Sequence, residues 1–103
     1  MTKIWPFEDP PDDRVYTTRF VLDKDYPILV VSHDPDGKWE FLCGTTDKPK
    51  DAREILLGEV LDLDERIREV ADLPVGWRAF RSAPDAPWMQ QPFSAADLAR
   101  FRK

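Results

Sequence analysis

The sequence predicts an α+β domain in which a small antiparallel sheet is packed by a central helix and a short C-terminal helix. Three patterns carry this prediction. Residues 28–44 read as a β-hairpin, residues 59–71 carry apolar side chains at helical spacing, and residues 94–97 resemble an N-terminal capping box. We expect an irregular N-terminal arm over residues 1–13 and a single domain over residues 14–103.

Length and composition fit one domain with its own core. The chain has 103 residues and is 42% hydrophobic, with four Trp, six Phe and two Tyr. Its single cysteine excludes an intrachain disulfide and indicates a reducing compartment. The N-terminus has no run typical of a signal peptide, and no stretch approaches the roughly 20 apolar residues of a membrane span. We therefore expect a cytoplasmic protein of bacterial type with no membrane partner.

Charge and motifs exclude several function classes. The net charge of −5 argues against nucleic acid as a partner, because binding it requires neutralising phosphates. The acidic residues between positions 59 and 72 lack the spacing and central glycine of a calcium loop, and they alternate with Arg66 and Arg68 as on a solvated helix face. The chain has no phosphate-binding glycine loop, no CxxC and no GxSxG. We expect no metal ion and no cofactor.

The hairpin turns at residues 34–37 (DPDG), where proline and glycine suit a type I turn followed by a bulge. A three-residue loop of this kind predicts the cross-strand pairs Asp34–Lys38, His33–Trp39, Ser32–Glu40, Val31–Phe41 and Leu29–Cys43. Because side chains alternate along a strand, one face is expected to be apolar apart from an imidazole: Leu29, Val31, His33, Trp39, Phe41 and Cys43. The opposite face is expected to be half polar: Ile28, Val30, Ser32, Glu40 and Leu42.

Before the hairpin, residues 15–22 are rich in β-branched and aromatic side chains and predict a strand. A turn over residues 23–27 would join it to the hairpin in a three-stranded antiparallel meander. Trp5 and Phe7 are candidates for docking the N-terminal arm on the body.

After the hairpin, residues 51–58 fit either a short strand or the start of a helix, and the strand is favoured. The helix over residues 59–71 is expected to stop before Pro74, since proline disfavours helical backbone in the residue that precedes it. Residues 77–81 alternate as a strand, and residues 82–92 form a proline-containing loop that holds Trp88. A short helix is expected to close the chain at Phe101.

His33 is the only histidine, and two interpretations compete. With Asp34 or Asp36 it could serve as a general base or a metal ligand. Alternatively, it stacks on Trp39 and bonds a backbone group, while the two aspartates form the turn. The packing interpretation is favoured, and Cys43 is expected to be a buried thiol too far from His33 to form a nucleophilic pair.

Trp77, Arg81 and Trp88 form a more suggestive group, because tryptophan and arginine are enriched at binding hot spots. Either these residues contact a protein partner, or the loop folds back and Trp88 covers the sheet.

Three segments carry a resemblance to a known family. They are residues 31–34 (VSHD), residues 36–41 (DGKWEF) and residues 72–81 (DLPVGWRAFR), followed by Trp88. In combination they resemble a widespread family of small uncharacterised bacterial proteins, over roughly residues 28–88. Two portions, one with Trp39, Phe41 and Gly44 and one with Leu73 and Gly76, are also distantly similar to a bacterial domain proposed to act in toxin immunity, although the upstream part of that pattern is absent here. The resemblance implies a compact α+β domain of unassigned function, and neither family supplies a catalytic residue to carry over.

We expect a non-catalytic protein-binding domain, of an immunity-like kind, that binds through Trp77, Arg81 and Trp88. The alternatives are a structural or oligomerising domain, and a small enzyme or metal-binding protein using His33 with Asp34 or Asp36.

Overall fold

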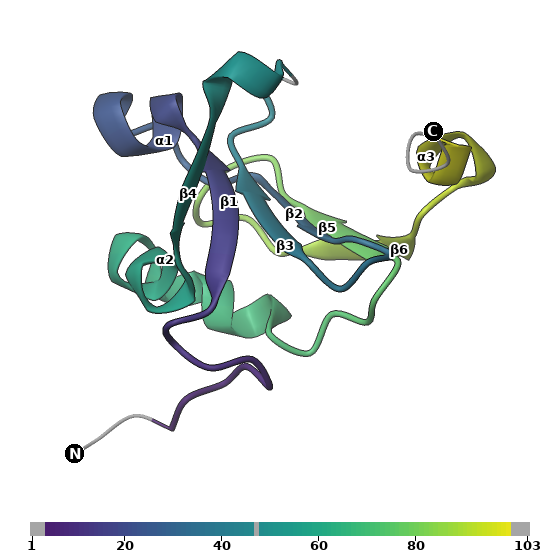
Figure 1. Cartoon of the computed structure of the whole chain (residues 1–103), viewed down its shortest axis with the longest axis horizontal. Coiled ribbons are helices and arrows are strands. Elements are labelled where there is room, and N and C mark those ends of the chain that lie inside the picture. The colour runs from purple at the N-terminus through teal and green to yellow at the C-terminus, as the bar shows by residue number, and fades with distance from the viewer. Residues whose placement is uncertain (1–3, 47, 100–103) are drawn as a thin grey trace.

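The computed structural model describes residues 4–46 and 48–99, and over these residues it confirms the α+β class with a six-stranded sheet in the order β4-β1-β3-β2-β5-β6 (Figure 1). The strands are β1 (Arg14–Thr18), β2 (Val30–His33), β3 (Trp39–Leu42), β4 (Ala52–Leu56), β5 (Trp77–Phe80) and β6 (Met89–Pro92). The α-helices are α1 (Arg19–Lys24), α2 (Leu57–Leu63) and α3 (Ala95–Ala99), and η1 (Pro49–Asp51) and η2 (Glu65–Val70) are 3₁₀ helices.

The hairpin of β2 and β3 has the predicted register. His33 lies opposite Trp39 and Val31 opposite Phe41, and the Asp34 N–H donates to the Lys38 carbonyl at 2.8 Å. Gly37 closes the turn with φ at +88°, where a side chain would be strained. One expectation is wrong: Ile28 lies in the core rather than on the half-polar face. The strand starts only at Val30, so the alternation does not extend back to Ile28.

The predicted meander is wrong in two respects. The strand expected over residues 15–22 ends at Thr18, because the Thr18 hydroxyl accepts a hydrogen bond from the Val21 N–H and starts α1. The strand also pairs differently from the prediction. β1 runs parallel to β3 and antiparallel to β4, whereas β2 lies between β3 and β5. The sheet is therefore mixed.

Residues 51–58 contain the favoured strand, β4, followed directly by α2. The helix predicted over residues 59–71 is interrupted at Asp64, whose backbone is extended. Its carboxylate accepts the Arg66 N–H at 2.9 Å and caps η2, which explains the break. The apolar stripe points inward in part: Val60, Ile67 and Val70 are buried, whereas Leu63 is 49% exposed at the end of α2.

Strand β6 also departs from the prediction, because residues 89–92 were expected to lie in a loop. It pairs antiparallel with β5 and adds one strand to the sheet beyond β5. β5 matches the prediction for residues 77–81 closely.

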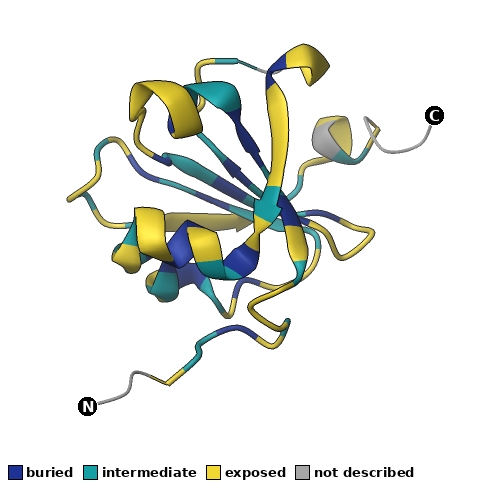
Figure 2. Cartoon of the chain, turned by 60° about the vertical axis from the view of Figure 1, so that its left-hand side comes forward, coloured by how far each residue is buried: buried dark blue, intermediate teal, exposed yellow. Residues whose placement is uncertain are grey.

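The core lies between α2, η2 and one face of the sheet. Figure 2 shows the buried residues along the strands and on the inner side of these helices. The central side chains are Val15, Val31, Phe41, Leu57, Val60, Ile67, Val70 and Ala79. The N-terminal arm docks as expected, with Phe7 buried edge-on against Trp39. Among the described helices, none has the length and apolar character needed to cross a membrane.

Candidate functional site

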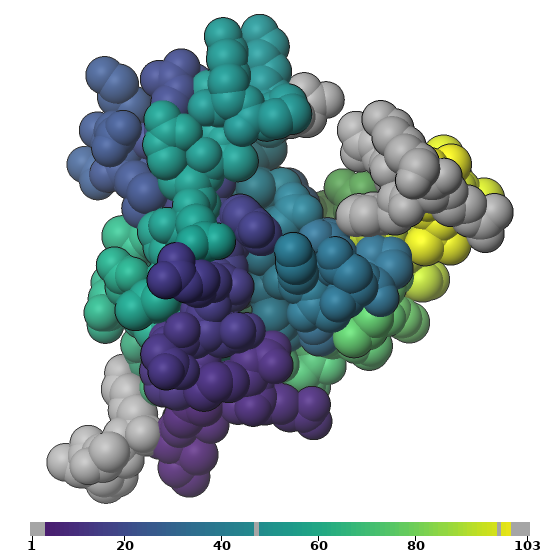
Figure 3. All heavy atoms as spheres, in the orientation of Figure 1, coloured from purple at the N-terminus to yellow at the C-terminus, as the bar shows by residue number. Residues whose placement is uncertain are grey.

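The face of the sheet opposite the core is hollowed. A concavity of about 450 Å³ lies over β1, β3, β2 and β5 and is bounded by the connection into β4 and by Phe93. Figure 3 shows the molecular surface hollowed between that connection (teal) and the C-terminal residues (yellow). Its polar lining is Tyr16, Thr17, Thr18, Ser32, Asp34, Glu40, Thr46, Lys48 and Arg78, and its apolar lining is Val30, Leu42, Pro49, Ala52 and Phe93.

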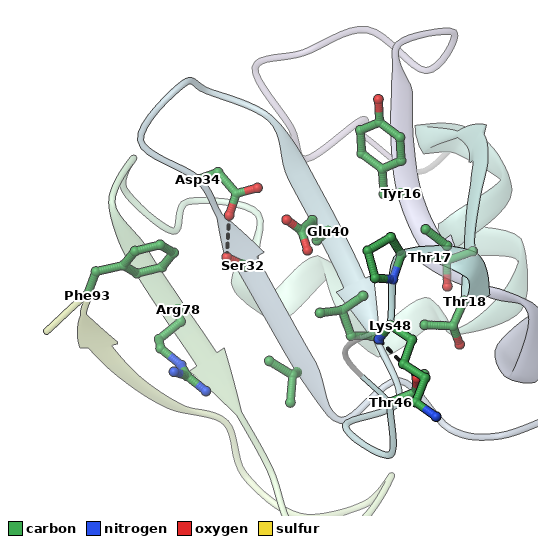
Figure 4. A pocket seen from close by; sticks show the side chains of 14 residues that line it. Tyr16, Thr17, Thr18, Ser32, Asp34, Glu40, Thr46, Lys48, Arg78 and Phe93 are labelled. Carbon is green, nitrogen blue, oxygen red and sulfur yellow. Dashed lines mark hydrogen bonds between the residues drawn. The ribbon is translucent and has the colours of Figure 1, made fainter. Parts of the chain in front are cut away.

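Four polar residues in this lining form a row across the strands. The registers place Tyr16 beside Glu40, Glu40 beside Ser32, and Ser32 beside Arg78. Neighbouring strands lie about 4.8 Å apart, so directly paired residues project from the same face of the sheet as neighbours. Figure 4 shows the four side chains on β1, β3, β2 and β5 around the hollow. The sheet therefore brings together a phenol, a carboxylate, a hydroxyl and a guanidinium group that are distant in sequence.

Asp34 adds a second carboxylate at the end of β2. It is only 4% exposed, and its Oδ1 accepts a hydrogen bond from the Ser32 hydroxyl at 2.6 Å (Figure 4). Its backbone carbonyl accepts the Gly37 N–H at 2.8 Å. Asp34 thus both forms the hairpin turn, as the sequence predicted, and lines the hollow.

The connection into β4 forms one wall of the hollow and is held by Asp51. The carboxylate of Asp51 accepts hydrogen bonds from the Thr46 hydroxyl at 2.6 Å and from Arg19 Nε at 2.7 Å. These two partners hold the pKa of Asp51 below its ordinary value. Lys48 donates its backbone N–H to the Thr46 hydroxyl at 3.2 Å and also lines the hollow.

His33 lies on the other face of the sheet. Its imidazole stacks on Trp39, with ring centroids 3.9 Å apart and an interplanar angle of 13°, and its Nδ1 is 2.7 Å from the Leu73 carbonyl, to which it donates. Asp34 points into the hollow, whereas Asp36 accepts the Lys38 N–H in the exposed turn. The structure therefore does not bring the three candidate catalytic residues together, and the packing interpretation of His33 agrees with its contacts.

Cys43 is buried, as expected. Its Sγ lies 3.4 Å from the Thr18 hydroxyl and 3.1 Å from the Thr45 hydroxyl. Burial opposes ionisation of the thiol, but the hydrogen bonds from Thr18 and Thr45 together outweigh it and lower the pKa of Cys43. The thiol is thus polarised but not accessible.

Arg81 is 4% exposed and is used inside the fold. Its Nε and Nη2 donate to the Ile28 carbonyl at 3.1 and 2.8 Å, and its Nη1 donates to the Pro84 carbonyl at 2.7 Å. Nη2 also pairs with the Asp64 carboxylate. The guanidinium carbon lies 4.2 Å from the ring centroid of Trp88. Arg81 therefore ties β5, η2 and the Trp88 loop together.

Trp77 and Trp88 are half-buried and pack against the core. Trp77 is paired with His33, and Trp88 directly precedes Met89, the partner of Phe80 at the other end of β5. His33 and Trp88 thus lie at opposite ends of β5, on the order of 10 Å apart along the strand. Binding through Trp77, Arg81 and Trp88 stays a prediction, and none of the three is among the described residues that line the hollow.

Part of the lining of the hollow could be predicted from the sequence. The hairpin register placed Ser32 opposite Glu40 on the half-polar face, and the alternation of residues 77–81 separated Arg78 from Trp77 and Arg81. The contribution of Tyr16, and the position of Arg78 beside Ser32, depend on pairings between strands distant in sequence. No local pattern specifies those pairings.

Within residues 4–46 and 48–99, no three His, Cys, Asp or Glu side chains gather in a way that could hold a metal ion. Comparisons of the chain with protein-family models, with curated proteins and with solved structures found no match.

Proposed function

We propose that this chain is a non-catalytic protein-binding domain that receives its partner on the hollowed face of the sheet. The observation that supports the proposal is the row of Tyr16, Glu40, Ser32 and Arg78 across four strands. The two rare groups with catalytic potential, His33 and Cys43, contact packed side chains and backbone instead.

The shape of the hollow favours a protein over a small molecule. Sites for small ligands enclose 70–90% of the ligand surface, whereas this hollow lies open to one side of the sheet (Figure 3). An open surface that combines apolar side chains, among them Val30, Leu42 and Phe93, with polar groups resembles a protein interface, in which the polar groups fix orientation.

The charges of the hollow define the partner further. Glu40 lies near the middle of the hollow and Asp34 at the end of β2, while Arg78 and Lys48 lie on opposite sides of Glu40 (Figure 4). Such mixed charge gives specificity to a complementary surface more than it adds affinity. The overall charge of −5 favours encounter with a basic protein. An immunity-like role, with a basic toxin as the partner, is the finer form of this proposal, and it is supported by the resemblance and by this charge.

The test has two steps. First, p-benzoylphenylalanine replaces Tyr16 in the expressing cells, and the cross-linked protein is identified. Second, that protein is purified and titrated calorimetrically with the wild type and with the variants Tyr16→Ala, Ser32→Ala and Arg78→Ala. We expect saturable binding and a loss of affinity of about tenfold or more in at least two variants, as for residues at the centre of an interface.

Two further variants serve as controls. Glu69 lies on η2, away from the hollow, so the Glu69→Ala variant should bind the partner like the wild type. Trp77→Ala tests the surface that the sequence suggested. If Trp77→Ala abolishes binding while the Tyr16, Ser32 and Arg78 variants bind normally, the partner uses the other surface and the proposal is wrong.

A further inference from the structure

Strand β6 is an exposed edge of the sheet. Within the described residues the sheet ends at β6 on one side and at β4 on the other. All four residues of β6 are exposed, and the Met89 side chain is 58% exposed. An exposed edge strand presents backbone groups that can pair with another strand.

The register shows which backbone groups of β6 point outward. The Phe93 N–H donates to the Gly76 carbonyl at 2.8 Å, which makes these two residues a hydrogen-bonded pair. Such pairs alternate along an antiparallel ladder, so Gln91 and Met89 bond to β5. Gln90 therefore directs both its N–H and its carbonyl away from the sheet. Pro92 directs only a carbonyl outward.

The two edges differ in charge. β4 carries Arg53 and Glu54, and Glu54 is ion-paired with Arg14 at 2.6 Å, which is a common protection of an edge. Residues 86–96, by contrast, contain no charged side chain, in a chain that is 34% charged and has a net charge of −5. Two copies of this acidic protein would repel each other over most of their surfaces, but not along β6.

We propose that β6 pairs with the β6 of a second copy, antiparallel, about a two-fold axis at Gln90. In this arrangement the Gln90 N–H of each copy donates to the Gln90 carbonyl of the other, and Met89 lies beside Gln91 of the other copy. Pro92 is the other outward-facing residue of the strand, so a register shifted towards it would place a proline where an N–H is needed. The axis stands perpendicular to the sheet and turns both hollows to the same side of the dimer.

The pairing is expected to be reversible, since a four-residue strand buries less than the roughly 1,200 Å² of a stable interface. Sedimentation equilibrium from about 10 µM to about 1 mM spans the range expected for such a small interface. The mass of the wild type should rise from 12.0 kDa towards twice that value. Gln90→Pro removes the outward N–H without removing a bond to β5 and should remain monomeric over the whole range.

Glu54→Pro is the matched control on the opposite edge. The Leu57 N–H donates to the Asp13 carbonyl at 2.8 Å, so by the same alternation the Glu54 N–H also points outward. This variant should dimerise like the wild type, and circular dichroism checks that both variants fold. In the wild type, the Gln90 amide should exchange with solvent more slowly at the higher concentration, while the Glu54 amide should not change.

Three results would overturn the proposal. They are a monomeric wild type at about 1 mM, a Gln90→Pro variant that dimerises normally, and a loss of dimer in Glu54→Pro that equals the loss in Gln90→Pro. None of these results bears on binding at the hollow, which is measured with the purified partner.

Discussion

The imidazole of His33 lies parallel to the indole of Trp39, 3.9 Å away between ring centroids, and its Nδ1 bonds the Leu73 carbonyl. This arrangement joins the end of the hairpin to the segment that follows η2. The only histidine of the chain therefore has a structural explanation that requires no reaction.

His33→Ala should destabilise the fold by about 1–3 kcal/mol, because it removes an aromatic contact and leaves the Leu73 carbonyl without its donor. Urea unfolding followed by far-UV circular dichroism measures the change. Asp36→Ala, in the exposed turn, is the control and should shift the midpoint much less. A His33 variant as stable as the wild type would contradict the structural role.

Arg81→Met should destabilise the fold by about 3 kcal/mol or more, because the Asp64 carboxylate and the Ile28 carbonyl lose a buried cationic partner. The double variant Arg81→Met/Asp64→Asn should recover part of this loss, since the uncompensated charge is then removed. Thermal unfolding of the single and double variants measures the coupling. Simple addition of the two effects would show that the pair is not coupled.

Acid should destabilise the fold in part through Asp51. Its pKa is lower in the folded chain than its ordinary value of 3.8, so the unfolded chain binds the proton more readily. The stabilisation is present above about pH 4 and is lost as the pH falls through the folded pKa. The urea midpoint of the wild type should decrease as the pH is lowered from about 5 to about 3, and the midpoint of Asp51→Asn should decrease less over that range. Equal slopes for both proteins would mean that Asp51 does not contribute.

Cys43 should react with a thiol reagent more slowly in the folded chain than in urea, by at least about tenfold, because access requires local opening. Its lowered pKa alone would favour reaction, so this measurement separates burial from ionisation. The absorbance of the released thiolate after addition of dithionitrobenzoate gives the rate. Similar rates in both states would show that the thiol is exposed.

The sequence by itself determined the local features of this protein. The DPDG turn and the alternation around it specified the hairpin register, and with it the neighbours of His33, because both depend on residues close together in the chain. The helical stripe identified Val60, Ile67 and Val70 as buried, although it did not reveal that Asp64 caps a new 3₁₀ helix. A similar capping bond at Thr18 ends β1. The β-branched and aromatic residues at positions 15–22 had instead predicted a longer strand.

Only the tertiary structure decided which strands are neighbours. Tyr16, Ser32 and Arg78 come together because β1 lies beside β3 and β5 lies beside β2. The same folding buries Arg81, one of the candidate binding residues, and makes it contact three segments of the chain. Pairing between strands that are distant in sequence depends on how all the elements pack around the core, so it cannot be predicted from local sequence patterns. The hollow, the candidate site of this protein, is a product of that packing.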